Sequence, residues 1–267
     1  MLYYIALFFA ISSKWIYNDQ NKWGGICKSG LEQSPINLLT NNKNNNKKLI
    51  FNFKNTYVEY FNNGVYLEAE ACKKKKLGYF IYSDNIYYVT QFHFHSVSEH
   101  TINYKHYPME LHIVANNYLN KNMAVISLIF DNGINSKFLQ NIGWDKDLSI
   151  LPMPLCKNGK LLTPCNDNND HIDYKIIDKI KKKINFSYLN ELLKNNGHLF
   201  YHYRGSLTTP PCTEGVDWFI YRKTLPISKN QLKYYTIFLQ SNSLLLKNHY
   251  HNNRDITSIN DRNIDFV

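Results

Sequence analysis

The most informative stretch of this 267-residue chain is Gln91-Phe92-His93-Phe94-His95. Successive side chains of an extended strand face opposite sides, so the two histidines share one face and the two phenylalanines share the other. The phenylalanines can then bury the back of the strand in a hydrophobic core, while the imidazoles project into a common space. The stretch therefore predicts a strand that packs against the core on one face and presents two imidazoles on the other.

A second strand-like run, ELHIV, occupies residues 110–114. Its alternation places Glu110 and His112 on one face, opposite two aliphatic side chains. If the two runs pair in one sheet, the side chains of His93, His95 and His112 can converge on the same face of that rigid sheet. Three neutral imidazoles that leave one coordination position open are a ligand set for catalytic zinc. A structural role is the better interpretation of any one of these histidines, but the three together favour a metal site.

Other segments with a period of two predict further half-buried strands. With the two runs above, these segments are Leu49–Phe53, Thr56–Phe61, Tyr79–Tyr82, Ile86–His95, Glu110–Asn116, Ala124–Phe130 and Phe219–Arg222. Helical patterns are few, and they cover Ser136–Ile142, Asp173–Ile184 and Gln231–Gln240. No internal repeat and no Pro/Gly/Ser linker divides the chain. We therefore expect one β-rich domain with short helices at its edges.

The composition indicates a globular protein with a sizeable core. Hydrophobic residues make up 44% of the chain and charged residues 19%, which excludes a disordered chain. The formal net charge of +10 favours polyanions or acidic membranes as partners but says nothing about the fold. Runs rich in Asn and Lys are expected to be solvated loops and turns, and a polyanion-binding patch is the alternative. These runs are Asn41–Lys48, Lys73–Lys76, Asn166–Asp170 and Lys179–Lys183.

The N-terminal segment resembles a secretory signal peptide. The apolar run Leu2–Ile11 is shorter than the ~20 residues that a membrane-spanning helix needs. Its length suits the hydrophobic region of a signal peptide, and Ala10-Ile11-Ser12 offers a small-residue cleavage site, although no basic residue precedes the run. We therefore expect residues 1–13 to be the signal peptide of a secreted protein and residues 14–267 to form one domain. The alternative is that the run forms an N-terminal strand of the core.

Further motifs surround the two histidine runs. They are KWIY at 14–17, Trp23, QSPIN at 33–37, Asn62-Asn63-Gly64, SEH at 98–100, SLTTPPCTEGVDW at 206–218, Asn252-Asn253-Arg254 and Arg262. Together with QFHFH and ELHIV, these motifs resemble the landmarks of an α-class carbonic anhydrase, in the same order and over about residues 14 to 262. The resemblance implies a mainly β (α+β) fold: a single domain with a large, mostly antiparallel, twisted central sheet and short peripheral helices.

The resemblance also implies an enzyme that reversibly hydrates carbon dioxide to bicarbonate and a proton. The zinc ligands would be His93, His95 and His112, and the attacking group would be zinc-bound hydroxide. Thr208 would accept a hydrogen bond from that hydroxide and would donate its own proton to Glu99. This relay would orient the hydroxide toward the substrate carbon.

Other side chains would support the ligands and line the substrate site. Each imidazole ligand should donate its second ring N–H to an outer partner. Gln91 and Glu110 lie near enough in sequence to be such partners, and the resemblance adds Asn252. The matching positions for an apolar substrate pocket are Val114, Val125, Leu207 and Trp218. Plain core packing is the alternative role for these four side chains.

The chain has five cysteines, so at least one is left over if the compartment is oxidising. Cys27 and Cys212 match a pair that is disulfide-bonded in secreted members of the family. Such a bridge would agree with the signal peptide, because both imply an oxidising compartment. The spacing of Cys156 and Cys165 would allow a second bridge, which would leave Cys72 free.

Val65 is the most important departure from the family pattern. The most efficient members have a histidine after the Asn-Asn-Gly motif, which shuttles protons between the zinc site and bulk water. Valine cannot carry a proton, so we expect slow, buffer-dependent turnover, with Glu68 or a nearby tyrosine substituting in part. Ser96, Ala115 and the stretch from Arg254 to Arg262, which lacks the usual prolines, also differ and indicate a divergent member.

The competing hypothesis is a non-enzymatic binding protein on the same fold. Some relatives have lost metal ligands and act as interaction modules, and a charge of +10 would suit a sulfated glycan or an anionic membrane. All three histidines are present in this chain, together with Thr208 and Glu99, so the sequence favours the enzyme. The expected partners are Zn2+ and carbon dioxide or bicarbonate, with weak polyanion or membrane-surface contact through the basic loops and no nucleic acid.

Overall fold

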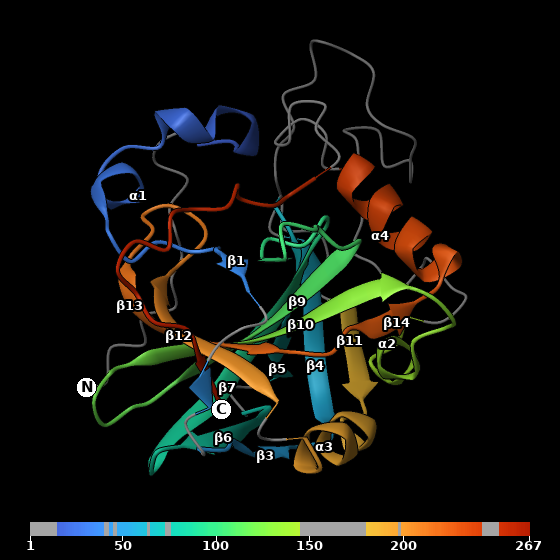
Figure 1. The fold of residues 1–267 in the computed structure, drawn as a ribbon. Helices are drawn as coiled ribbons and strands as arrows, with labels where there is room; N and C mark the ends of the chain where they lie inside the picture. The colour runs from blue at the N-terminus through green and yellow to red at the C-terminus, as the bar shows by residue number, and fades with distance from the viewer. Residues whose placement is uncertain are drawn as a thin grey trace, which may run out of the picture.

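A large sheet forms the framework of the protein (Figure 1). This computed structural model describes residues 15–39, 43–44, 47–62, 65–72, 76–144, 180–196, 199–241 and 251–267. Its 13 strands in that part of the chain are β2 (Lys43–Asn44), β3 (Ile50–Phe53), β4 (Thr56–Asn62), β5 (Leu67–Ala71), β6 (Gly78–Tyr82), β7 (Asn85–His95), β9 (Met109–Asn116), β10 (Met123–Asn132), β11 (Ile180–Ile184), β12 (Phe200–Ser206), β13 (Glu214–Tyr221), β14 (Leu225–Ile227) and β15 (Asp265–Phe266).

The strand order confirms the expected sheet. Its main path is β11-β4-β5-β7-β9-β10-β13-β12-β15-β2, while β14 pairs with β10, and β6 joins β3 to β7. Most neighbours are antiparallel, and the parallel pairs are β10 with β13, β10 with β14, and β15 with β2. β1 (Asn37–Leu38) and β8 (Thr101–Ile102) form a separate parallel pair. The fold is thus mainly β, with a large, mostly antiparallel sheet.

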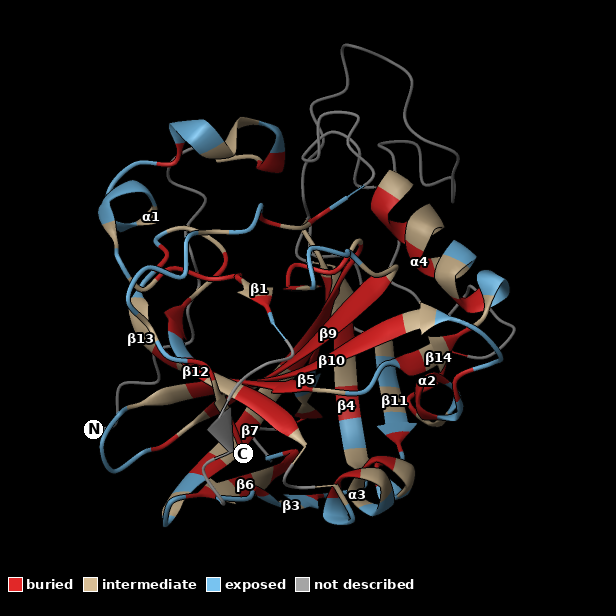
Figure 2. Cartoon of the chain, in the orientation of Figure 1, coloured by how far each residue is buried: buried red, intermediate tan, exposed pale blue. Residues whose placement is uncertain are grey.

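The central strands β9 and β10 are buried on both faces over most of their length, and β7 is buried on both faces at its end, over residues 92–95 (Figure 2). β10 reads MAVISLIFDN, a nearly continuous apolar run that suits a strand covered on both sides, whereas β9 reads MELHIVAN and also buries Glu110 and His112. A large core cluster that includes Phe92 and Phe94 packs on one face of the sheet, and a second cluster includes Val125 and Trp218. Because side chains alternate along a strand, the histidines of β7 face away from Phe92 and Phe94.

The helices are short and surround the sheet. They are the 3-10 helix η1 (Tyr17–Lys22), α1 (Ile26–Ser29), α2 (Lys137–Asn141), α3 (Ser187–Lys194) and α4 (Lys229–Ser241). α4 buries Tyr235, Phe238 and Leu239, whose spacing places them on one helical face. α3 is joined to β3 by two hydrogen bonds between the Asn190 side chain and the Phe53 backbone. None of the helices in the described ranges is long and apolar enough to cross a membrane.

The structure confirms the predicted strands and corrects one predicted helix. All seven alternating segments lie on strands, and α2 and α4 match Ser136–Ile142 and Gln231–Gln240. The helix predicted over Asp173–Ile184 is wrong in its described part, because residues 180–184 form β11 and pair with β4. The basic run Lys179–Lys183 was expected to be a loop and instead lies largely on this strand. Backbone pairing at the sheet edge thus outweighs the helical pattern, and lysines are common on exposed edges.

Several predictions fall on residues outside the described ranges. These residues include 1–14, Asn63, Gly64, Cys156 and Cys165. The signal peptide and its alternative, an N-terminal strand, therefore remain predictions. The second disulfide remains a prediction for the same reason.

Candidate metal centre

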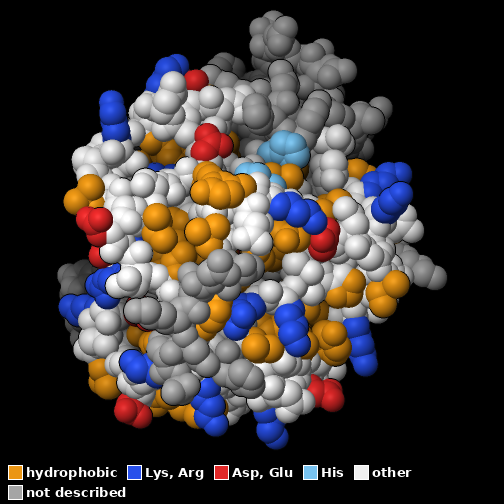
Figure 3. All heavy atoms as spheres, in the orientation of Figure 1, with side chains coloured by type: hydrophobic (Ala, Val, Ile, Leu, Met, Phe, Trp, Pro, Cys, Tyr) orange, Lys and Arg blue, Asp and Glu red, His pale blue; other side chains and the backbone are white. Residues whose placement is uncertain are grey.

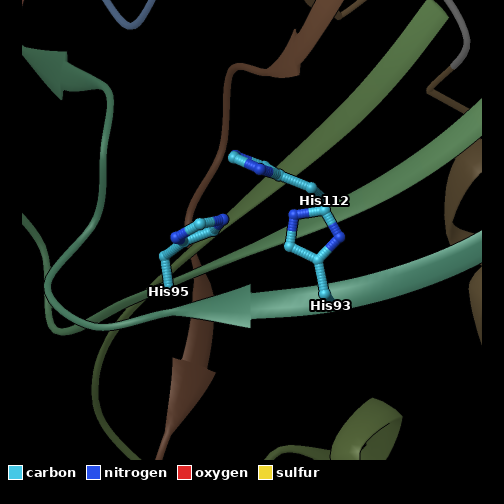
Figure 4. A group of neighbouring side chains, drawn as sticks. All are labelled: His93, His95 and His112. Carbon is cyan, nitrogen blue, oxygen red and sulfur yellow. The ribbon is translucent and has the colours of Figure 1, made fainter. Parts of the chain in front are cut away.

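Three histidines converge above the middle of the sheet (Figure 4). His93 and His95 lie on β7 and His112 lies on β9, where antiparallel pairing places His93 directly opposite His112. One ring nitrogen from each side chain lies within 4.8 Å of the other two, and all three residues are buried. The alternation of β7 and the register of β7 with β9 together create this cluster, which we call the histidine triad.

The second nitrogen of each ring in the triad is held by a hydrogen bond. Nδ1 of His93 bonds Oε1 of Gln91 at 2.8 Å, and Nε2 of His112 bonds Oε1 of Glu110 at 2.8 Å. Nδ1 of His95 donates to the backbone oxygen of Asn252 at 2.7 Å, because a carbonyl oxygen can only accept. These bonds orient the rings and leave Nε2 of His93, Nε2 of His95 and Nδ1 of His112 for a further ligand.

The free nitrogens fit a divalent metal. Nε2 of His95 is buried and has no hydrogen-bond partner among the described residues, which is costly unless a ligand satisfies it. Burial lowers the pKa of His95 to about 4 and also lowers the pKa values of His93 and His112. The rings are therefore neutral at pH 7, which is the form that binds metals. Three nitrogen donors match the set that zinc prefers at catalytic sites.

Glu110 is the centre of a buried hydrogen-bond network behind the triad. Its carboxylate accepts from His112, from Nδ1 and the backbone N–H of His100, and from the Ser127 hydroxyl at 2.6 Å. Burial alone would raise the pKa of Glu110, but His100 and His112 hold it well below its ordinary value. His100 in turn bonds the hydroxyl of Tyr203 at 2.7 Å. Sequence spacing indicated Glu110, but nothing in the sequence marked His100, Ser127 or Tyr203 as its partners.

Glu99 lies beside the triad and is fully buried. Its Oε1 accepts from the backbone N–H of Arg254 at 2.8 Å and lies 3.6 Å from Nδ1 of His95, and its Oε2 lies 3.9 Å from Nδ1 of His112. Burial raises the pKa of Glu99 to about 7, although the Thr208 side chain lowers it in part. The structure therefore brings Thr208, Glu99 and the triad into one buried site.

The four predicted pocket residues lie in the second core cluster or against it. Val125 and Trp218 are buried members of that cluster, and Val114 and Leu207 pack on it. The ring of Trp218 lies 4.8 Å from the ring of His112, and its N–H donates to the backbone oxygen of Ser206. The wall beside His112 is therefore apolar and has no unsatisfied donor from Trp218.

A disulfide joins Cys27 to Cys212, as the resemblance implied. Gln33 donates to the backbone oxygen of Cys212, and Arg254 donates to the backbone oxygen of Cys27. The bridge thus ties the N-terminal arm to the loop that contains Thr208. Cys72 is buried, and within the described residues it has no disulfide partner.

Two features near the triad were not evident from the sequence. The ring of Tyr66 stacks on the ring of His93 with 4.3 Å between centroids. The side chain of Asn252 donates to the backbone oxygen of Val65 at 3.1 Å and to that of Phe94 at 3.1 Å. No periodic pattern places residues 65 and 66 beside the triad, so only the folded chain reveals these contacts.

Comparisons with known proteins agree with this geometry. A family model for eukaryotic-type carbonic anhydrases matches residues 18–135 and 157–267. A carbonic anhydrase of Klebsiella pneumoniae is 27% identical over 260 residues, which cover 94% of this chain and 90% of the relative. Alpha carbonic anhydrase 2 of Arabidopsis thaliana is 29% identical over 83% of this chain and 82% of its own length. The structure of alpha-carbonic anhydrase from Thermovibrio ammonificans with the inhibitor sulfanilamide has a TM-score of 0.66 at 27% identity, covering 90% of this chain and 89% of that chain.

Proposed function

The chain belongs to the eukaryotic-type carbonic anhydrase family, whose members are lyases that hydrate carbon dioxide, and we propose that its activity depends on one Zn2+ held by His93, His95 and His112. The observation that carries the proposal is the convergence of three neutral imidazoles with a buried, unpartnered Nε2 on His95. As is known for carbonic anhydrase, bound zinc lowers the pKa of a water molecule to ≈ 7 and so supplies hydroxide at neutral pH.

The residues around the triad would orient the reactants and exclude water. Glu99 would hold the hydroxyl of Thr208, and Thr208 would accept a hydrogen bond from the nucleophile and direct it toward the substrate carbon. An apolar wall for carbon dioxide would be formed by Val114, Val125, Leu207 and Trp218. Carbon dioxide has no net dipole, so it gains little from polar contacts. Gln91, Glu110 and the backbone of Asn252 would keep the three ligands in position.

Val65 would limit the rate at which the proton leaves the site. Its side chain has no titratable group, and its backbone oxygen is engaged by Asn252. Protons would then leave mainly through dissolved buffer, so turnover would be slow at low buffer concentration. Glu68 on β5, which lies opposite His93 on β7, or a nearby tyrosine could substitute in part.

We also propose that the protein is secreted and that residues 1–13 are its signal peptide. The disulfide between Cys27 and Cys212 supports this, because such bonds persist in oxidising compartments. Processing near Ala10-Ile11-Ser12 would separate this segment from the domain of residues 14–267. Mass spectrometry of the N-terminus after secretion from a eukaryotic host would test this, and an uncleaved Met1 would refute it.

A non-enzymatic polyanion-binding role is the weaker candidate. The complete triad supports the enzyme, since a binding module has no need of it. Figure 3 shows Lys and Arg side chains in separate groups over one face of the molecule, with Asp and Glu among them, rather than one basic patch. Any contact with a sulfated glycan or an anionic membrane would therefore be weak and would decrease with added salt.

The test combines zinc content with stopped-flow hydration of carbon dioxide. We expect one zinc per chain, hydration that rises with buffer concentration, and loss of both zinc and activity in His112→Ala. His202→Ala is the matched control, because His202 lies outside the triad and contacts Tyr82 and Phe219 instead. A zinc-free, inactive wild-type protein would refute the proposal, and zinc uptake without hydration would refute the assigned reaction.

A further inference from the structure

Tyr66 covers two members of the histidine triad. Its ring stacks on His93 with 4.3 Å between centroids and 23° between planes. The same ring lies 5.8 Å from the ring of His95 at 55°. Among the described residues, Tyr66 is the only aromatic side chain stacked face to face on a histidine of the triad.

His93 needs this support more than the other two ligands. It is 8% exposed, whereas His95 is 0% and His112 is 1% exposed, so less of the protein packs around it. The hydrogen bond from Nδ1 to Gln91 holds one atom of the ring. The imidazole can still tilt about that bond, which would move Nε2 away from the metal position. A stacked ring restricts this motion, because tilting the imidazole would break the face-to-face contact.

The backbone holds Tyr66 firmly over His93. Tyr66 directly precedes β5, and β5 pairs with β7 so that Glu68 lies opposite His93. On its other side, the backbone oxygen of Val65 accepts a hydrogen bond from the side chain of Asn252, whose own backbone oxygen orients His95. Asn252 therefore orients His95 with its backbone oxygen and anchors the loop that carries Tyr66 with its side chain.

We propose that Tyr66 is a positioning residue that holds the His93 imidazole in its metal-binding orientation. The aromatic ring performs this role, and the hydroxyl group is not required. The proposal rests on the proposed zinc site but not on the reaction carried out there. Loss of the stacking contact should weaken zinc binding by about 2- to 10-fold, which is the range expected for one aromatic pair.

The test uses the full chain and Zn2+ itself. The dissociation constant and the release rate of zinc are measured against a chromophoric chelator for wild type, Tyr66→Phe and Tyr66→Ala. We expect Tyr66→Phe to resemble wild type and Tyr66→Ala to bind about 2- to 10-fold more weakly with faster release. Tyr82→Ala is the matched control. The Tyr82 ring lies 5.0 Å from the ring of His202, a histidine outside the triad, so this change removes an aromatic neighbour from a histidine that would not bind zinc.

A second measurement needs no metal. In NMR spectra of the zinc-free protein, the ring protons of His93 should be shifted upfield by the Tyr66 ring in wild type and Tyr66→Phe, and this shift should disappear in Tyr66→Ala. Unchanged zinc affinity in Tyr66→Ala, or equal weakening in both variants, would overturn the proposal. A wild-type protein that binds zinc but does not hydrate carbon dioxide would refute the reaction and leave the role of Tyr66 intact.

Discussion

The backbone oxygen of Asn252 accepts a hydrogen bond from Nδ1 of His95 at 2.7 Å, although the two residues are 157 positions apart. The Asn252 side chain adds bonds to the backbones of Val65, Phe94 and Ser96. The C-terminal segment therefore takes part in the metal centre without contributing a ligand. It fixes the tautomer of His95 and leaves Nε2 of that ring facing the other two histidines.

Replacement of Asn252 by alanine should affect stability and zinc binding together. The change removes the acceptor of the buried backbone N–H of Ser96, at a cost of about 1–3 kcal/mol if water cannot reach it, and it removes one donor each from the backbone oxygens of Val65 and Phe94, of which the Phe94 oxygen keeps its hydrogen bond from Tyr235. Zinc affinity should fall by up to about 10-fold, because the side chain holds in place the backbone oxygen that orients His95. Urea denaturation with and without zinc would measure both effects. A variant with normal stability would show that the bonds from the side chain are not important.

Replacement of Glu110 by glutamine should weaken zinc binding about 10- to 100-fold. The amide keeps the size of the side chain but offers one acceptor oxygen in place of two, and it cannot accept from His112, His100 and Ser127 together. Chelator competition would measure the zinc affinity. Glu32→Gln is a suitable control, because Glu32 is half-buried and its carboxylate faces Arg204 and not the triad. Equal affinity in wild type and Glu110→Gln would contradict this interpretation of the network.

The zinc-free protein should lose stability as the pH falls from about 6.5 toward 4. Burial lowers the pKa of His95 to about 4 and also lowers those of His93 and His112, while the unfolded chain binds protons at the ordinary value near 6.5. Glu99 acts in the opposite direction, because its pKa is raised to about 7 and the folded state already holds its proton. Three histidines outweigh one carboxyl, so the free energy of unfolding of the zinc-free protein should increase as the pH rises through this range.

Urea midpoints of the zinc-free protein at pH 7 and pH 5 would measure this dependence. Substituting His93 and His95 by glutamine should flatten it, since two of the three proton-binding groups are removed. A midpoint that rises on acidification would mean that Glu99 dominates instead.

Removal of the Cys27–Cys212 disulfide should destabilise the protein by about 2–5 kcal/mol. The cysteines are separated by 185 positions, so the bond closes a long loop in the unfolded chain. Denaturation of Cys27→Ser/Cys212→Ser should resemble that of the reduced wild type. Cys72→Ala is the control, and its stability should still respond to reductant. A double variant as stable as the oxidised protein would refute this contribution.

Introducing a histidine at position 65 should restore rapid proton release. An imidazole titrates near pH 7, so Val65→His should raise hydration about 10-fold or more at low buffer concentration and change it little at high concentration. Val65→Ala is the control, because it removes bulk without adding a proton carrier. If Val65→Ala accelerates turnover as much as Val65→His, access to the site and not proton transfer limits the rate.

The local features of the site were predictable from the sequence. Alternation along β7 placed His93 and His95 opposite Phe92 and Phe94, and this follows from the geometry of any extended chain. The pattern also identified the strand that carries His112. The pairing of Cys27 with Cys212 came from resemblance to a family, since spacing cannot decide which of five cysteines pair.

Tertiary structure decided which distant groups meet. The register that sets His93 opposite His112, the bond from Arg254 to Glu99, and the stacking of Tyr66 on His93 all join segments that no short-range pattern relates. The same reason explains the error at residues 180–184, where pairing with β4 made a strand from a segment with a helical pattern. Side-chain alternation is a property of a single strand, whereas these contacts exist only when the chain closes into one sheet.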